Sequence, residues 1–358
     1  WIPNIQNASG PVYRAIAEAI ESDICSGALR SGALLPTQRE LADVMGLGLG
    51  TITKAYKEAE RKGLIKGDRR RGTIVGPFDK HDSILSEIVS TVGEGDEINL
   101  LPHGSQLPNL GRVLQKMAGQ ADVDSILRFP SVSEKDAHKQ AGAAWLARLG
   151  YEVEYDKILL SVGAHNGVLA ALASVTEPGD YIVAGRLTYM GLKGIVDFLR
   201  LKILTVEMDR EGILPDSFED WCKRRSVKAL YCIPTVDNPT NATMSLDRRK
   251  EIVAIAERHG VSIVEDNMLG PMMTESLPTL KSLAPHRCFL VSSATKILCP
   301  GLKVGFVVPP EGSYKVAMDS LRSMSVRVPP LIADTFTHLI NSSEAQRTID
   351  EARHEARS

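Results

Sequence analysis

Seven short apolar runs, separated by stretches of helical periodicity, constrain the fold of this chain more than any other feature. They cover residues 158–162, 181–184, 202–207, 229–233, 262–265, 289–292 and 304–308. Repeated alternation of strand and helix predicts a mostly parallel sheet with helices on both faces. We therefore expect an α/β domain that binds its ligand at the carboxyl edge of the sheet.

Lys296 follows the sixth of these runs, in the segment SSATKILCPGLKVG at residues 292–305. A lysine at the end of a buried strand is expected to be partly desolvated, which lowers its pKa and makes its amine nucleophilic. Such an amine suits a Schiff base with an aldehyde cofactor. A lysine in a surface loop is the plainer alternative, and the residues around it must decide.

Three more motifs follow strands of the predicted sheet. Residues 161–166, SVGAHN, join a strand to a helix whose free N–H groups suit a phosphate. Asn238, before Pro239, could donate its amide to a phenolate oxygen, and Asp266 ends an apolar strand, where a buried carboxylate needs a cation such as a protonated pyridine nitrogen. Each motif also has an ordinary explanation as a turn of small residues, an Asn-Pro turn or a helix-capping aspartate.

The first 76 residues carry a different pattern. A helical stretch from Val12 to Ile24, a capping box at residues 37–40 and a third helix at 51–62 precede two short strands at 64–66 and 73–75. Three helices and a basic hairpin predict a winged helix-turn-helix. Between residues 51 and 75, eight Lys and Arg face three acids, which suits contacts with DNA phosphates. A solvated basic face is the alternative.

Composition bounds the class of protein. The 358 residues exceed one ordinary domain, and 43% hydrophobic with 24% charged residues is typical of a soluble globular chain. No apolar run approaches the length of a membrane span, and the five cysteines show no CxxC spacing. We expect a cytoplasmic protein without a metal site or membrane partner, with domains at residues 1–76 and 98–358 and a linker at 77–97.

The stretch from Leu35 to Val75, LPTQRELADVMGLGLGTITKAYKEAERKGLIKGDRRRGTIV, resembles the GntR-type winged-helix domain of bacterial transcription regulators. The resemblance implies double-stranded DNA as the partner. It implies that these residues lie at the DNA surface: Arg39, Thr51, Lys54 and Arg70. Gly48-Leu49 replaces the Ser-Arg that usually precedes the recognition helix, so the operator sequence stays open.

From residue 98 onward, a glycine turn, Asn-Pro, Asp and Ser-x-x-Lys follow in the order that resembles fold-type I pyridoxal phosphate enzymes, the aspartate aminotransferase superfamily. The resemblance implies pyridoxal 5'-phosphate as the cofactor. Its implied contacts are Lys296 to the aldehyde as an imine, Asp266 to the ring nitrogen, Asn238 to the ring hydroxyl oxygen, Tyr189 on the ring face, and Ser293, Lys303, Gly163, Ala164 and His165 around the phosphate.

A GntR-type head joined to an aminotransferase-like body resembles the MocR subfamily of regulators. The resemblance implies a homodimeric transcription regulator in which pyridoxal phosphate is the effector, or the handle for a small amine or amino-acid effector. An aminotransferase with an accessory DNA-binding head is the alternative. A regulator that senses something else is a third reading, because Lys303, Leu269 and Phe129 replace an arginine and two tyrosines of the family.

The small C-terminal domain of the aminotransferases, with the arginine that grips a substrate carboxylate, is expected to be absent, because the chain stops at Ser358. A transaminase needs that arginine to orient the amino acid for reaction. We therefore name no catalytic residues and expect no sustained transamination.

Overall fold

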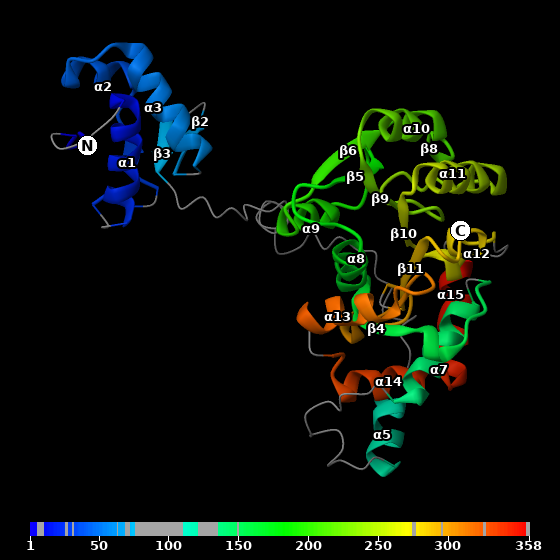
Figure 1. The fold of residues 1–358 in the computed structure, drawn as a ribbon. Coiled ribbons are helices and arrows are strands. Elements are labelled where there is room, and N and C mark those ends of the chain that lie inside the picture. The colour runs from blue at the N-terminus through cyan, green and yellow to red at the C-terminus, as the bar shows by residue number, and fades with distance from the viewer. Residues whose placement is uncertain are drawn as a thin grey trace. The chain divides into compact units, whose positions relative to one another are not determined.

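The computed structural model describes residues 1–5, 11–25, 28–30, 32–62, 64–68, 72–75, 110–120, 135–148, 150–273, 277–294, 296–324 and 327–355. The chain forms two compact units, Trp1–Gly93 and Glu94–Ser358, and each is described by itself (Figure 1). The predicted linker at residues 77–97 lies outside the described residues.

The first unit is a winged helix-turn-helix, as the sequence predicted. Its helices are α1 (Val12–Cys25), α2 (Gln38–Met45) and α3 (Leu49–Arg61), and its strands are β1 (Leu34–Leu35), β2 (Ile65–Asp68) and β3 (Gly72–Val75). The strands pair antiparallel in the order β1-β3-β2. The sequence analysis did not expect β1, because two residues are too few to show alternation.

Local signals explain where α2 begins and ends. The Thr37 hydroxyl accepts from the Glu40 backbone N–H at 3.3 Å, and the Glu40 carboxylate accepts from the Thr37 N–H at 2.8 Å. This is the predicted capping box. Gly46 ends the helix in the left-handed conformation at φ 65°, which glycine adopts at little cost. A small core then joins α2 to its neighbours through Ile16, Leu41 and Ile52.

The second unit is built on a seven-stranded sheet in the order β4-β12-β11-β10-β9-β5-β6. Its strands are β4 (Leu159–Val162), β5 (Tyr181–Gly185), β6 (Lys202–Val206), β9 (Val227–Cys232), β10 (Ser262–Asp266), β11 (Cys288–Ser293) and β12 (Val304–Val308). Only β12 runs antiparallel to its neighbours in this sheet. The prediction of a mostly parallel α/β sheet is therefore confirmed.

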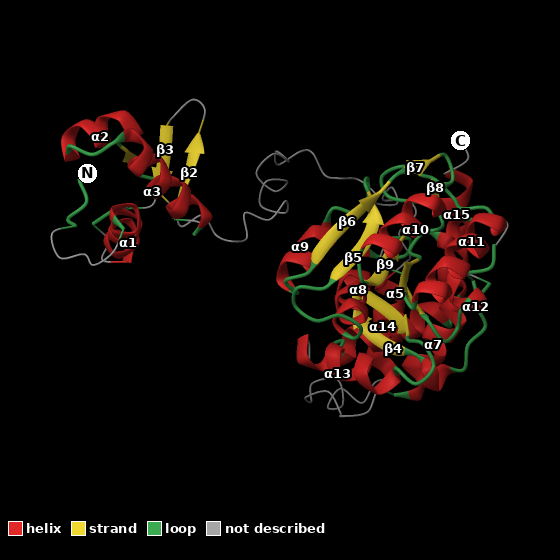
Figure 2. Cartoon of the chain, turned by 45° about the horizontal axis from the view of Figure 1, so that its top comes forward, coloured by secondary structure: helices red, strands yellow, loops and turns green. Residues whose placement is uncertain are grey.

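Helices cover both faces of this sheet, because its buried strands are apolar on both sides (Figure 2). On one face Phe289 and Val291 of β11 pack with α8 (Gly163–Ala173), α9 (Gly191–Phe198) and α13 (Tyr314–Met324). On the other face Cys288 packs with α10 (Pro215–Arg224), α11 (Leu246–His259) and α12 (Leu280–Leu283). Leu290 packs with α5 (Leu110–Gln120), α7 (Asp136–Ala147), α14 (Pro330–Ile340) and α15 (Ser343–Glu355).

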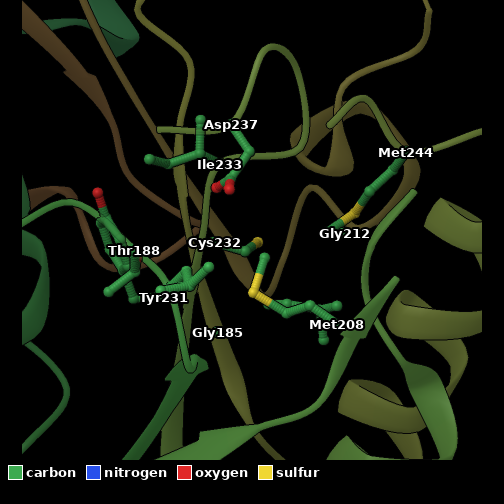
Figure 3. A pocket seen from close by; sticks show the side chains of 11 residues that line it. Gly185, Thr188, Met208, Gly212, Tyr231, Cys232, Ile233, Asp237 and Met244 are labelled. Atoms are coloured by element: carbon green, nitrogen blue, oxygen red, sulfur yellow. The ribbon is translucent and has the colours of Figure 1, made fainter. Parts of the chain in front are cut away.

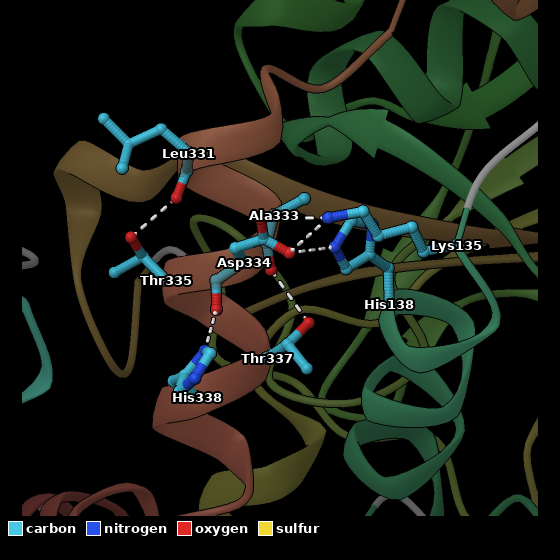
Figure 4. Close-up of polar contacts among 8 residues, drawn as sticks. All are labelled: Lys135, His138, Leu331, Ala333, Asp334, Thr335, Thr337 and His338. Carbon is cyan, nitrogen blue, oxygen red and sulfur yellow. Dashed lines mark hydrogen bonds and ion pairs between the residues drawn. The ribbon is translucent and has the colours of Figure 1, made fainter. Parts of the chain in front are cut away.

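Polar contacts also join α7 to α14 (Figure 4). Asp334 on α14 contacts His138 Nε2 at 2.7 Å and Lys135 Nζ at 3.3 Å. These partners hold the pKa of Asp334 below its usual value although burial acts in the opposite direction. The pair therefore adds a polar contact at the margin of the apolar core between the two helices.

Candidate functional site

The carboxyl ends of the parallel strands carry most of the residues that the sequence analysis singled out. Tyr189 follows β5, Asn238 follows β9, Asp266 ends β10 and Lys296 follows β11. Lys303 precedes β12, and because β12 runs antiparallel to β11, its beginning lies at that same edge. Residues far apart in the chain therefore share one edge of the sheet.

A buried carboxylate with one unused oxygen is the most unusual feature of this edge. Asp266 is 4% exposed. Its Oδ2 accepts a hydrogen bond from the Tyr231 hydroxyl at 2.8 Å, whereas its Oδ1 is buried and has no partner among the described residues. Burial raises the pKa of Asp266 to about 6, and Tyr231 and Lys296 oppose that rise. Leaving such an acceptor unpaired is costly, so the site suits a cationic N–H donor.

The Asp266 carboxylate also interacts electrostatically with the amine of Lys296. The Lys296 side chain is half-buried, and burial lowers the pKa of its amine while the Asp266 charge acts in the opposite direction. A larger fraction of this amine is therefore neutral and nucleophilic than in an exposed lysine. The partial burial and the lowered pKa agree with the expectation from the sequence.

Tyr189 and His165 meet beside Asp266. The Tyr189 hydroxyl lies 3.2 Å from His165 Nδ1, and the two rings meet edge to face with centroids 6.1 Å apart. Burial, and then the charge of Asp266, raise the pKa of Tyr189. The Tyr189 ring also packs tightly on Gly191, where an added Cβ would lie 2.4 Å from it. These contacts fix the ring position.

The start of α8 forms an uncapped helix end at this edge. No side chain caps the helix at Val162, so the first backbone N–H groups, from Gly163, Ala164 and His165, are available to an acceptor. The backbone of Lys303 lies beside this end, because a Cβ on Gly163 would be 4.0 Å from the Lys303 carbonyl oxygen, and the Lys303 side chain is exposed. A helix N-terminus with a nearby lysine is a suitable anion seat.

Ser293 lies close to this seat, but its hydroxyl is occupied. The side chain is fully buried and donates to the Val304 carbonyl at 2.7 Å. Gly305 pairs with Ser293 across one strand boundary and with Ser161 across the other. The serine therefore ties β11 to β12 at the point where both reach the edge.

Hydrogen bonds of neighbouring residues hold the turn that carries Asn238. Asp237 is buried and accepts from the Thr240 hydroxyl at 2.6 Å, and burial raises the pKa of Asp237. Arg249 of α11 is fully buried and donates to the Pro234 carbonyl and the Thr235 hydroxyl at 2.9 and 2.8 Å. The loop that carries Asn238 is thereby fixed to the helix behind it.

A small pocket opens between this turn and the end of β5 (Figure 3). Tyr231, Cys232 and Asp237 line it on one side, and Thr188 and Met208 also contribute to its wall. Its empty volume is about 230 Å³, including open solvent at its mouth. Tyr231 thus has its ring at the pocket while its hydroxyl bonds Asp266.

Two residues of this site could not be identified from the sequence, Tyr231 and Arg249. Tyr231 lies inside the run ALYCI, where an aromatic residue is expected simply to fill the core. Arg249 lies in a charged helical stretch, so the sequence predicts an exposed side chain. A polar atom inside an apolar strand was the one signal for Tyr231, because a buried hydroxyl needs a partner.

In the first unit, the predicted DNA-contact residues that the structure describes lie on α2 and α3. Arg39 and Lys54 are exposed and Thr51 is half-buried. The Thr53 hydroxyl donates to Gln38 Oε1 at 2.8 Å, which ties the two helices together. Arg61 and Lys62 instead pair with Glu58 and Glu21, and Arg70 lies outside the described residues.

Comparison with known proteins assigns both units. Residues 12–75 match the model of the family "Bacterial regulatory proteins, gntR family", and residues 97–353 match that of "Aminotransferase class I and II". The uncharacterized HTH-type transcriptional regulator YdeF of Bacillus subtilis (strain 168) is 32% identical over 356 residues, which span 99% of this chain and 77% of YdeF. This chain belongs to the MocR subfamily of GntR-type transcription regulators.

More distant similarities agree with the assignment of this MocR-type regulator. The HTH-type pyridoxine biosynthesis transcriptional regulator PdxR of Corynebacterium glutamicum is 23% identical over 310 residues, 84% of this chain and 66% of PdxR. The structure of Pyrococcus horikoshii kynurenine aminotransferase is similar with a TM-score of 0.67 and 21% identity, over 76% of this chain and 70% of that one. The second likeness establishes the aminotransferase fold.

The described residues of this MocR-type regulator show neither a metal-binding cluster nor a helix able to span a membrane. Among them, no group of three or more His, Cys, Asp or Glu side chains could hold a metal ion. Within the same part of the chain, no helix combines the length and apolar character needed to cross a membrane.

Proposed function

We propose that this DNA-binding regulator holds pyridoxal 5'-phosphate in its aminotransferase-like domain, either as the effector or as the handle for an amine effector. The observation that carries the proposal is the buried Oδ1 of Asp266, which has no partner among the described residues, beside the half-buried amine of Lys296. A carboxylate in this state is stabilised by a protonated ring nitrogen, and the amine suits the aldehyde of the same cofactor.

The residues of the edge fit the remaining parts of the cofactor. The uncapped start of α8 and Lys303 suit a phosphate, although Lys303 would act as a point charge without the paired donors of an arginine. Ser293 would assist only after its hydroxyl turned away from the Val304 carbonyl. Tyr189 would pack on the ring, and Asn238 would bond the ring hydroxyl oxygen.

When bound, the cofactor supplies an aldehyde that reversibly joins primary amines. The protein's part is to present Lys296 as a neutral nucleophile, to keep Asp266 ionised against burial and to hold the Tyr189 ring in place. An amine effector could compete with Lys296 at the same position. Such competition supplies differential contacts on which a change in DNA affinity could depend.

The runner-up function is an aminotransferase with an accessory DNA-binding domain. The desolvated amine of Lys296 favours it, because the same neutral amine can accept a proton from a substrate carbon. Sustained formation of keto acid from an amino acid by the purified chain would place this reading first. A homodimer is part of our proposal on family resemblance, and light scattering of the purified chain tests it.

Reductive trapping tests the cofactor site. We expect borohydride treatment of the protein with pyridoxal phosphate to leave a stable adduct, and peptide mass mapping to find it on Lys296. The Lys296→Ala variant should lose the adduct and keep its circular dichroism spectrum. Lys193→Ala, which removes an exposed lysine of α9, is the matched control and should keep the adduct. An adduct on another lysine refutes the assignment of the site.

A further inference from the structure

The hydrogen bond between Tyr231 and Asp266 is not explained by the proposed cofactor contacts alone. We propose that Tyr231 is a positioning residue that fixes the Asp266 carboxylate with Oδ1 facing the ring nitrogen of pyridoxal phosphate. This inference rests on the proposed function. Tyr231 is proposed to touch no part of the cofactor and to act only through Asp266.

The geometry divides the two carboxylate oxygens between two tasks. Tyr231 is fully buried on β9, and its hydroxyl donates to Oδ2 of Asp266 at 2.8 Å. Oδ1 is equally enclosed but has no partner among the described residues. Because the tyrosine binds one oxygen only, the other is held as the free acceptor.

Hydrogen bonds hold the residues on either side of Asp266 in place. The Asn267 N–H donates to the Val291 carbonyl at 2.8 Å, which joins the end of β10 to β11. Glu265 accepts from the Lys281 N–H at 2.9 Å and from the Asn267 side chain at 3.2 Å. Among the described residues, the Tyr231 hydroxyl is the hydrogen-bond partner of the Asp266 carboxylate.

The electrostatic effects at this contact favour an ionised Asp266 and a protonated Tyr231. The Tyr231 hydroxyl lowers the pKa of Asp266 against the larger effect of burial, and Lys296 acts in the same sense. Burial raises the pKa of Tyr231 well above its usual value, so the hydroxyl stays protonated and remains a donor. The other titratable groups that interact with Asp266 are Tyr189 and Cys232, and both remain neutral because burial raises the pKa of each.

These facts predict how removal of one oxygen atom should change cofactor binding. In Tyr231→Phe the carboxylate loses its orienting donor and is protonated over a wider pH range. A charge-assisted hydrogen bond of this kind corresponds to a change of roughly tenfold in a dissociation constant. The weakening should be greater at pH 6 than at pH 8.5, because a larger fraction of Asp266 is then neutral in the variant.

The experiment is an absorbance titration of the full chain with pyridoxal phosphate at both pH values, for wild type and Tyr231→Phe. The matched control is Tyr181→Phe, which removes the hydroxyl of a half-buried tyrosine on β5 of the same sheet and should leave both constants unchanged. A pH-dependent loss in Tyr231→Phe alone supports the proposal. An equal loss at both pH values, or no loss, overturns it.

Two further measurements separate the possible failures. If wild type itself does not bind pyridoxal phosphate, the proposed function fails and this inference fails with it. If Tyr231→Phe does not fold, ¹³Cζ-tyrosine spectra of the cofactor-free protein carry the test. The Tyr231 signal should move in Asp266→Asn while the Tyr181 signal stays, and an unmoved Tyr231 signal refutes the contact.

Discussion

At the scale of single residues, the site contains a buried carboxylate, Asp266, that destabilises the cofactor-free protein when it is ionised. Asp266 and Glu265 are adjacent and buried, and burial raises their pKa values to about 6 and about 7. The Glu265 carboxylate accepts hydrogen bonds from Lys281 and Asn267, whereas Oδ1 of Asp266 has no partner in the described part of the chain. A destabilising group kept at a ligand edge is typical of a functional site.

The first prediction concerns the pH dependence of stability in the cofactor-free protein. The pKa of Asp266 is about 6 in the folded state and about 3.9 in an unfolded chain. The folded state therefore binds the proton more tightly, and the stability that this group contributes is lost as pH rises from about 3.9 through about 6. Asp266→Asn removes this loss.

Urea unfolding at pH 5 and pH 8 checks this prediction. Relative to wild type, the free energy of unfolding of Asp266→Asn should be higher at pH 8 than at pH 5 by on the order of 1–3 kcal/mol. Saturating pyridoxal phosphate should favour wild type instead, because only the carboxylate pairs with the ring. The same difference at both pH values would show that Asp266 does not titrate as described.

At the scale of elements, the anion seat depends on the close approach of β12 to the start of α8. A Cβ on Gly305 would lie 2.6 Å from the backbone carbon of Gly163 and 2.6 Å from the Ser161 hydroxyl oxygen. Only a residue without a side chain permits this approach. The glycine therefore positions the helix end beside Lys303.

The second prediction follows from this packing. Gly305→Ala should lower the free energy of unfolding by roughly 1–3 kcal/mol, as overpacked sites do, and should weaken pyridoxal phosphate binding. Gly301→Ala is the matched control, because nothing lies within 4 Å of its added Cβ. Thermal unfolding and absorbance titration measure both effects. Equal behaviour of the two variants would contradict the description of the seat.

The third prediction concerns α2 of the winged helix. Arg39 is exposed beside the capping box, where a guanidinium can reach a DNA phosphate. Arg39→Ala should weaken specific and non-specific DNA binding alike and reduce the slope of log affinity against log salt by about 1. Arg61→Ala, whose side chain is paired with Glu58 on α3, should change the slope less. An unchanged slope in Arg39→Ala would remove this residue from the contact surface.

The sequence predicted elements better than contacts. Each of the seven predicted strands appears, because apolar runs bounded by turns are typical of strands in a parallel sheet, although the edge strand β6 is mostly exposed. Lys296 and Asp266 could be named because they follow strands that end at one edge. The bond from Tyr231 and the anchoring by Arg249 could not, because both depend on partners brought close only by the folded sheet.

At the scale of the whole molecule, a regulator needs its ligand site to influence its DNA affinity. The two units have separate cores, and the chain joins them through residues that the structure does not describe. In allosteric proteins, the coupling free energy between two sites is typically about 1–3 kcal/mol, or about 5- to 150-fold in affinity. We therefore expect cofactor binding to change the dissociation constant of the regulator for DNA by a measurable factor.

DNA binding with and without pyridoxal phosphate is the decisive measurement for the proposed regulation. Fluorescence anisotropy with a DNA fragment selected from a random pool by the wild-type protein provides the dissociation constants. We predict a change of at least about fivefold for wild type on adding pyridoxal phosphate, and none for Lys296→Ala. No change in wild type, or the same change in both proteins, would contradict the claim that the cofactor at Lys296 is the regulatory signal.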